Sequence, residues 1–196
     1  MKLELAMAEA RTPVKVFALG KYGKDYLRTI GKTPSQTKLD DARIKELLTV
    51  QQYLIRAGHI AEAQEIVMTP TVTEEVKPGY HTDCCFRAHA VVQTKDRHTQ
   101  IVEVVRDDMR AMEELCQKLQ SIQRTVLGQR KLNMPLYRPD IVLVCETPAH
   151  QKAVEAILLQ SNCEFQFPLY LTNDAQTYGN PVCRYSGEVR TETALQ

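Results

Sequence analysis

The chain has 196 residues, which is enough for one large domain or for one domain with a small appendage. Its composition is ordinary for a globular protein, and 25 basic against 24 acidic residues leave a formal net charge of +1. This balance argues against a strongly basic nucleic-acid-binding module, although it leaves room for a local basic patch. No apolar run approaches the roughly 18 residues that a membrane span requires.

The first residues and the cysteines predict the compartment. Lys2, Glu4 and Glu9 interrupt the start of the chain, which therefore lacks the apolar region of a signal peptide. The six cysteines form no Cys-x-x-Cys pair and no Cys/His cluster, and the neighbours Cys84 and Cys85 would point to opposite faces of a strand. We therefore expect free thiols, no zinc site, no membrane association and a cytoplasmic location.

The N-terminal part is predicted to form a separate appendage. Residues 14–19 are typical of a short strand, and two glycines and a short helical turn follow. Residues 29–38 combine Gly, Pro, Ser and Thr, which is typical of a linker. We therefore predict an appendage over residues 1–38, a main domain over residues 39–185 and a flexible polar tail over residues 186–196.

The main domain begins with a predicted helix from Asp40 or Asp41 to about Ala57. Three strands in a meander, a long helix, a continuous apolar strand, a helix capped by Thr147 with Pro148 at its first position, and a last strand follow. The strands of the meander are predicted at 59–68, 84–94 and 99–105, with a turn at 78–79. The long helix is predicted at 107–127, the continuous apolar strand at 141–145 and the last strand at 165–172. A continuous apolar strand favours parallel pairing. The order predicts an α/β (mixed α+β) fold with a central mixed sheet flanked by helices.

Glu103 is a single acid within an apolar strand. By strict alternation it shares a face with Ile101 and Val105, opposite Val102 and Val104. A strand that is apolar on both faces is central, so Glu103 should be at least partly buried. Because a buried carboxylate without a partner is costly, Glu103 needs a cation, a basic partner or a bound proton.

A purely structural interpretation also accounts for the acids around this strand. Glu103 would pair with Arg106 or with Arg87 of a neighbouring strand. Asp107 or Asp108 would cap the long helix, where an acid also suits the helix dipole.

Other polar residues have an equally plain interpretation. Asp83 would cap a turn before its strand, and His89 is expected to be a packed or edge histidine rather than a base. The polar residues 172–174 are interpreted as a turn at the end of the last strand.

The order α-β-β-β-α-β, from about residue 40 to residue 175, resembles the core of the restriction-endonuclease-like (PD-(D/E)XK) fold. In that family an Asp near the second core strand and an E-x-K motif on the third converge on a divalent metal. Asp83, before the predicted strand 84–94, and Glu103, on the next strand, match the two acids. Val105 stands in place of the lysine, and Lys118 on the following helix could supply a migrated ammonium. The resemblance implies Asp83 and Glu103 as Mg²⁺ ligands and, with Lys118, as the catalytic residues of a nuclease.

The chain also resembles replication-relaxation-type proteins of bacterial plasmids and mobile elements, which pair a winged helix with a nuclease-like and often degenerate domain. "VKVFALGKYGKDYL" matches the wing strand and trailing helix, whereas the three-helix part that would enter the DNA major groove has no counterpart in this chain. The expected function is therefore a DNA-associated, non-catalytic homodimer of a plasmid or mobile element, involved in replication, mobilisation or their regulation. A Mg²⁺-dependent DNA endonuclease and a protein-interaction module without a nucleic-acid role are the alternatives, and no cofactor is expected except Mg²⁺ in the nuclease.

Basic residues concentrate in two segments that also contain tyrosines, so these segments could contact phosphates. Ordinary solvated side chains explain them equally well. The candidate DNA-binding residues are Lys21, Lys24 and Arg28 in the first segment and Arg124, Arg130 and Lys131 in the second.

Overall fold

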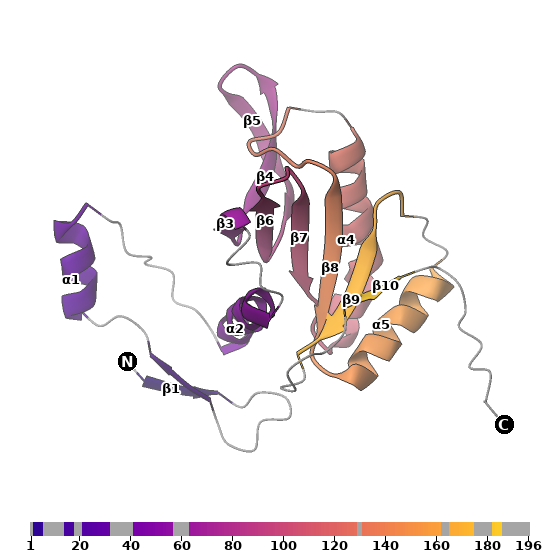
Figure 1. Cartoon of the computed structure of the whole chain (residues 1–196), viewed down its shortest axis with the longest axis horizontal. Coiled ribbons are helices and arrows are strands. Elements are labelled where there is room, and N and C mark those ends of the chain that lie inside the picture. The colour runs from indigo at the N-terminus through magenta and orange to yellow at the C-terminus, as the bar shows by residue number, and fades with distance from the viewer. Residues whose placement is uncertain are drawn as a thin grey trace. The chain divides into compact units, whose positions relative to one another are not determined.

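The computed structural model describes residues 2–5, 14–17, 21–31, 41–56, 63–128, 131–161, 165–174 and 182–185. The chain divides into two units, residues 1–48 and residues 49–196. The second unit has a mixed α+β fold with a central mixed sheet flanked by helices, as the sequence predicts (Figure 1). Within the described ranges, no helix has the length and apolar character that crossing a membrane requires.

The first unit contains a strand pair and a short helix. The strands β1 (Lys2–Leu5) and β2 (Val14–Phe17) are antiparallel. The helix α1 spans Lys21–Thr29. The predicted strand and helical turn are confirmed, whereas β1 was not predicted because four alternating residues are too short a pattern. Residues 32–40, most of the predicted linker, lie outside the described residues.

Six strands form the central sheet, in the order β10-β9-β8-β7-β6-β3 (Figure 1). The strands β3, β6 and β7 form an antiparallel meander, and β8 and β9 are parallel to β7. The parallel pairing inferred from the continuous apolar run is thus confirmed. The bounds are Ala63–Met68 for β3, Ala90–Thr94 for β6, Thr99–Val104 for β7, Pro139–Cys145 for β8, Leu169–Asn173 for β9 and Cys183–Arg184 for β10.

Helices cover both faces of this sheet. The helices α4 (Met109–Leu127) and α5 (Pro148–Gln160) pack on one face, where Leu119 and Leu158 are fully buried. On the other face, Val50, Tyr53 and Leu54 from the second half of α2 (Asp41–Arg56) pack with valines and Ala90 of the strands. At about 1.5–3 kcal/mol for each large apolar side chain buried, these contacts fix the layers of the fold.

A hairpin interrupts the meander, and here the predicted strand 84–94 is wrong in its bounds. The strands β4 (Thr71–Lys77) and β5 (Tyr80–Arg87) form a separate two-stranded sheet. Ala88 and His89 are not strand residues, and they separate β5 from β6. Gly79 has a φ of 81°, which suits a turn with Pro at the preceding position, so the predicted turn is confirmed.

Candidate functional site

Glu103 lies in the middle of the sheet and is only 2% exposed. Its strand β7 pairs with β6 on one side and with β8 on the other, so its backbone is enclosed by neighbours. Ile101 and Val105, on the same face, are also buried and belong to the core that α4 and α5 cover. The predicted burial of Glu103 is therefore confirmed, and its charge must be met by side chains on this face.

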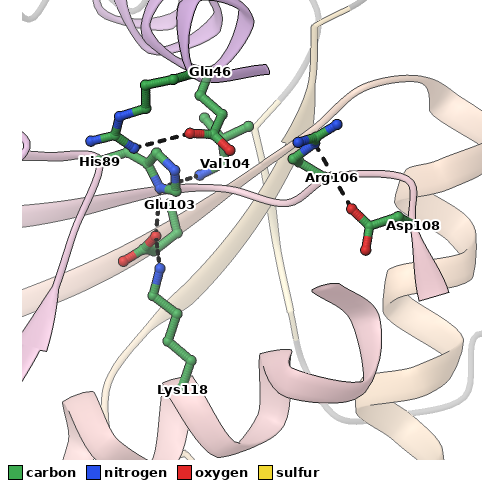
Figure 2. Close-up of polar contacts among 8 residues, drawn as sticks. Glu46, His89, Glu103, Val104, Arg106, Asp108 and Lys118 are labelled. Atoms are coloured by element: carbon green, nitrogen blue, oxygen red, sulfur yellow. Dashed lines mark hydrogen bonds and ion pairs between the residues drawn. The ribbon is translucent and has the colours of Figure 1, made fainter. Parts of the chain in front are cut away.

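Lys118 of α4 meets the charge of Glu103. Its ammonium nitrogen Nζ lies 2.6 Å from Glu103 Oε2 (Figure 2). Leu115 and Ile122, three residues before and four after Lys118, are both buried, so Lys118 borders the apolar stripe of α4. Its side chain is 38% exposed, so the stem lies along the helix surface toward the sheet while the ammonium reaches Glu103.

His89 provides the second contact, and sequence reasoning missed it as a partner of Glu103. Its Nδ1 lies 2.7 Å from Glu103 Oε2, and the Val104 amide nitrogen lies 3.2 Å from the same Nδ1 (Figure 2). One nitrogen cannot donate to the carboxylate and accept from the amide at once. The tautomer that carries its proton on Nδ1 donates to Oε2, where the Lys118 ammonium also lies.

The second carboxylate oxygen, Glu103 Oε1, is buried and has no hydrogen-bond partner among the described residues. Two basic side chains therefore share one oxygen while the other stays without a donor. The described side chains contain no group of three His, Cys, Asp or Glu residues that could hold a metal ion. One carboxylate beside an ammonium and an imidazole makes a poor donor set for Mg²⁺, which prefers several oxygen ligands. The metal that the nuclease resemblance implies does not fit these residues.

The other predicted acids lie elsewhere. Asp83 lies within β5 of the two-stranded sheet. The prediction that it precedes a strand is therefore wrong. Its side chain is outside the described residues, and its pairing with Glu103 in a metal site stays a prediction. The expected pairing of Glu103 with Arg106 or Arg87 is wrong, because Lys118 and His89 occupy Oε2.

The residues after β7 belong to the start of α4. Arg106 contacts Asp108, with 3.9 Å between Nε and Oδ2, and Asp108 directly precedes the helix. The Asp107 amide donates to Glu146 Oε1 at 3.3 Å. Both aspartates thus lie at the helix start where capping was expected, and their contacts are with Arg106 and Glu146.

A second polar group joins α2 to the end of β9. Asp174 accepts from Thr49 Oγ1 at 3.0 Å and pairs with Arg56 Nη2 at 3.3 Å, and Arg56 also donates to the Asn173 carbonyl. Burial raises the pKa of Asp174, while Thr49 and Arg56 oppose the rise. The predicted turn at 172–174 is wrong for Thr172 and Asn173, which belong to β9, and Asp174 directly after the strand anchors α2.

Cys145, at the end of β8 beside this group, is buried. Burial, with the charges of Asp107 and Glu146, raises the pKa of its thiol to about 12. Such a thiol stays protonated and unreactive at neutral pH.

The candidate DNA-binding residues fall into two groups. Lys21, Lys24 and Arg28 all lie on α1, where Arg28 pairs with Asp25 at 2.7 Å, and the side chains of the two lysines are outside the described residues. Arg124 is exposed in the last turn of α4, and Lys131 is exposed and paired with Glu75. Arg130 lies outside the described residues.

Comparisons with known proteins add no relative. No protein-family model matches the chain, and neither a curated protein nor a solved structure matches it. The fold and the site around Glu103 therefore define the class only as a mixed α+β protein with a buried carboxylate held by a lysine and a histidine.

Proposed function

We propose that the chain is a DNA-associated, non-catalytic protein with a degenerate restriction-endonuclease-like domain. It would act in the cytoplasm in the replication or mobilisation of a plasmid or mobile element, or in their regulation. The element order supports this proposal, because α2, the antiparallel β3, β6 and β7, then α4 and β8, follow the order of that family's core. On this proposal, the hairpin β4–β5 would be an insertion between the first two core strands.

The observation that carries the non-catalytic proposal is the contact of Lys118 with Glu103. Lys118 at 2.6 Å and His89 at 2.7 Å both contact Oε2 of Glu103, which is buried. Breaking such a pair leaves an uncompensated buried charge, which gives the protein a structural reason to keep all three residues. On this proposal, Glu103 does not bind a metal. Its contacts hold α4 and the start of β6 against β7.

An assay of plasmid DNA cleavage and binding, with and without Mg²⁺ or Mn²⁺, tests the proposal. We expect no cleavage, and binding that weakens steeply as salt rises, because phosphate contacts release counterions. Glu103→Gln should leave the binding unchanged. Absence of DNA binding, or binding that does not weaken with salt, would overturn the DNA association.

The second candidate function is a Mg²⁺-dependent DNA endonuclease. One observation favours it: Glu103 Oε1 is buried without a described partner, and an ammonium lies beside the same carboxylate. The site would then require Asp83 as a further ligand. Metal-dependent cleavage that both Glu103→Gln and Asp83→Asn abolish, while the exposed control Lys152→Gln leaves it intact, would establish this function.

We also propose a homodimer. Light scattering of the chain in solution would then give twice the 22.3 kDa of one chain, whereas the mass of one chain would contradict the dimer.

A further inference from the structure

Exposed basic and aromatic side chains gather at the end of the central sheet where β7 and β8 begin. The tip of the β4–β5 hairpin, the β6–β7 turn and the segment before β8 meet at this end. The Thr99 amide donates to the Tyr137 carbonyl at 2.8 Å, and the Glu75 amide donates to the Lys131 carbonyl at 2.7 Å. We call this surface the basic end and define it by Lys77, Tyr80, Lys95, Lys131, Tyr137 and Arg138.

The hairpin presents its tip from a rigid base. Val72 and Phe86, near its root, are buried in the main core. Asn133 exchanges three hydrogen bonds of 2.9–3.0 Å with Thr71 and Thr73, so that the segment after α4 covers the outer edge of β4. In Figure 1 the hairpin projects past the end of the central sheet. A fixed projection of this kind loses little conformational freedom when it binds a partner.

Tyrosines and charges give this end a distinct chemistry. Tyr80 and Tyr137 are 73% and 52% exposed, so both rings are accessible to a partner. Every residue of the basic end is exposed. At the opposite end of β7 the exposed acids stand among basic side chains, with Arg106 beside Asp108 and Arg110 beside Glu114.

We propose that the basic end binds single-stranded DNA, with phosphates on Lys77, Lys95 and Arg138 and with bases stacked on Tyr80 and Tyr137, while the ammonium of Lys131 is paired with Glu75. This inference rests on the proposed DNA association and names its surface and its substrate. Stacking on an exposed ring requires an unpaired base.

Fluorescence anisotropy of a labelled oligothymidylate, and of a blunt duplex of the same length, tests the inference on the full chain. We expect Tyr80→Ala to weaken binding of the single strand roughly 5- to 100-fold, and Tyr80→Phe to bind as the unmodified chain does, because the ring is retained. Lys77→Gln and Lys95→Gln should each lower the slope of log K against log salt by about 0.7.

The matched control is Lys152→Gln, which removes an exposed lysine from α5, outside the basic end. It should leave the affinity and the salt slope unchanged. If the unmodified chain binds DNA but the Tyr80 and lysine variants bind equally well, or if it prefers the duplex, the inference is overturned while the proposed DNA association stands. If the unmodified chain binds neither DNA, both are overturned.

Discussion

A carboxylate that is 2% exposed keeps its charge only where donors replace the water that it has lost. Glu103 has two such donors, one from α4 and one from the bend before β6. Both lie on Oε2, and Oε1 is buried without a hydrogen-bond partner among the residues that the structure describes. The stability of this region therefore depends more on keeping both donors than on the net gain from the pair.

Replacing Lys118 by Met removes the ammonium and keeps an apolar stem. We expect the free energy of unfolding to fall by about 2 kcal/mol, which is below the range of about 3–5 kcal/mol for breaking a fully buried pair, because water reaches the 38% exposed Lys118 side chain. Urea denaturation followed by circular dichroism measures the change. Lys152→Met on α5 is the control and should change the free energy by less than about 0.5 kcal/mol. An equal loss in both variants would contradict the role of Lys118.

Asp174 gives a pH dependence whose sign follows from its raised pKa. Because burial raises this pKa above the ordinary 3.8, the folded chain holds the proton to a higher pH than the unfolded chain does. Between the ordinary pKa and the raised pKa, the folded state binds more protons than the unfolded state. The free energy of unfolding therefore falls as the pH rises through the raised pKa.

Asp174→Asn should remove this dependence. We expect the free energy of unfolding of the original chain, minus that of the variant, to decrease as the pH rises from the ordinary carboxyl range. Urea titrations of both chains across acidic pH measure the difference, in which the other carboxyl groups cancel. A difference that is constant, or that increases with pH, would show that Asp174 is not destabilised by burial.

The sequence predicted the burial of Glu103, because alternation alone determines which face each residue of β7 occupies, and it left open whether a cation, a basic partner or a bound proton compensates the carboxylate. His89 was missed, although the hairpin register contains the signal. Gln93 pairs with Thr99 and Ala90 with Val102. One further step outward places His89 opposite Glu103. The distance to Lys118 depends on how α4 crosses the sheet, and a sequence pattern does not determine that.

At the scale of elements, α5 has a start that can be tested directly. Thr147 has extended backbone angles, and its side chain accepts a hydrogen bond of 3.1 Å from the His150 amide, with Pro148 at the first helical position. This confirms the predicted cap. Thr147→Ala should lower the free energy of unfolding by about 1 kcal/mol, while Thr147→Ser keeps the hydroxyl and most of the stability. Thermal unfolding of the two variants measures the difference, and similar losses in both would contradict the capping role.

Elements with a strong period were predicted, and elements fixed by tertiary pairing were not. The long helix and the buried strand matched α4 and β8 because their apolar patterns extend over many residues. The strand β4 escaped prediction because its charged sequence TVTEEVK is stabilised from outside, by β5 and by Asn133. The last predicted strand, 165–172, began too early, since its first residues pack as a loop ahead of β9.

At the scale of the whole molecule, the boundary between the two units runs through α2. The contacts divide the chain at Leu48 and Thr49, inside a helix that begins at Asp41. The second half of α2 supplies Val50, Tyr53 and Leu54, which cover one face of the sheet. The same half carries Thr49 and Arg56, which bind Asp174 at the end of β9. The second half of this helix therefore belongs to the core of the second unit.

Two shortened chains test whether α2 belongs to the core. A chain that begins at residue 39 keeps all of α2. We expect it to unfold in one cooperative transition, with a free energy of unfolding close to that of the same transition in the full chain. A chain that begins at residue 57 loses the three large apolar side chains of α2, each worth about 1.5–3 kcal/mol, and uncovers the valines of β6, β7 and β8. That loss approaches the roughly 5–15 kcal/mol by which a domain is stable, so we expect it to unfold or aggregate. Urea denaturation and size-exclusion chromatography compare the two, and equal stability would show that α2 is not part of the core.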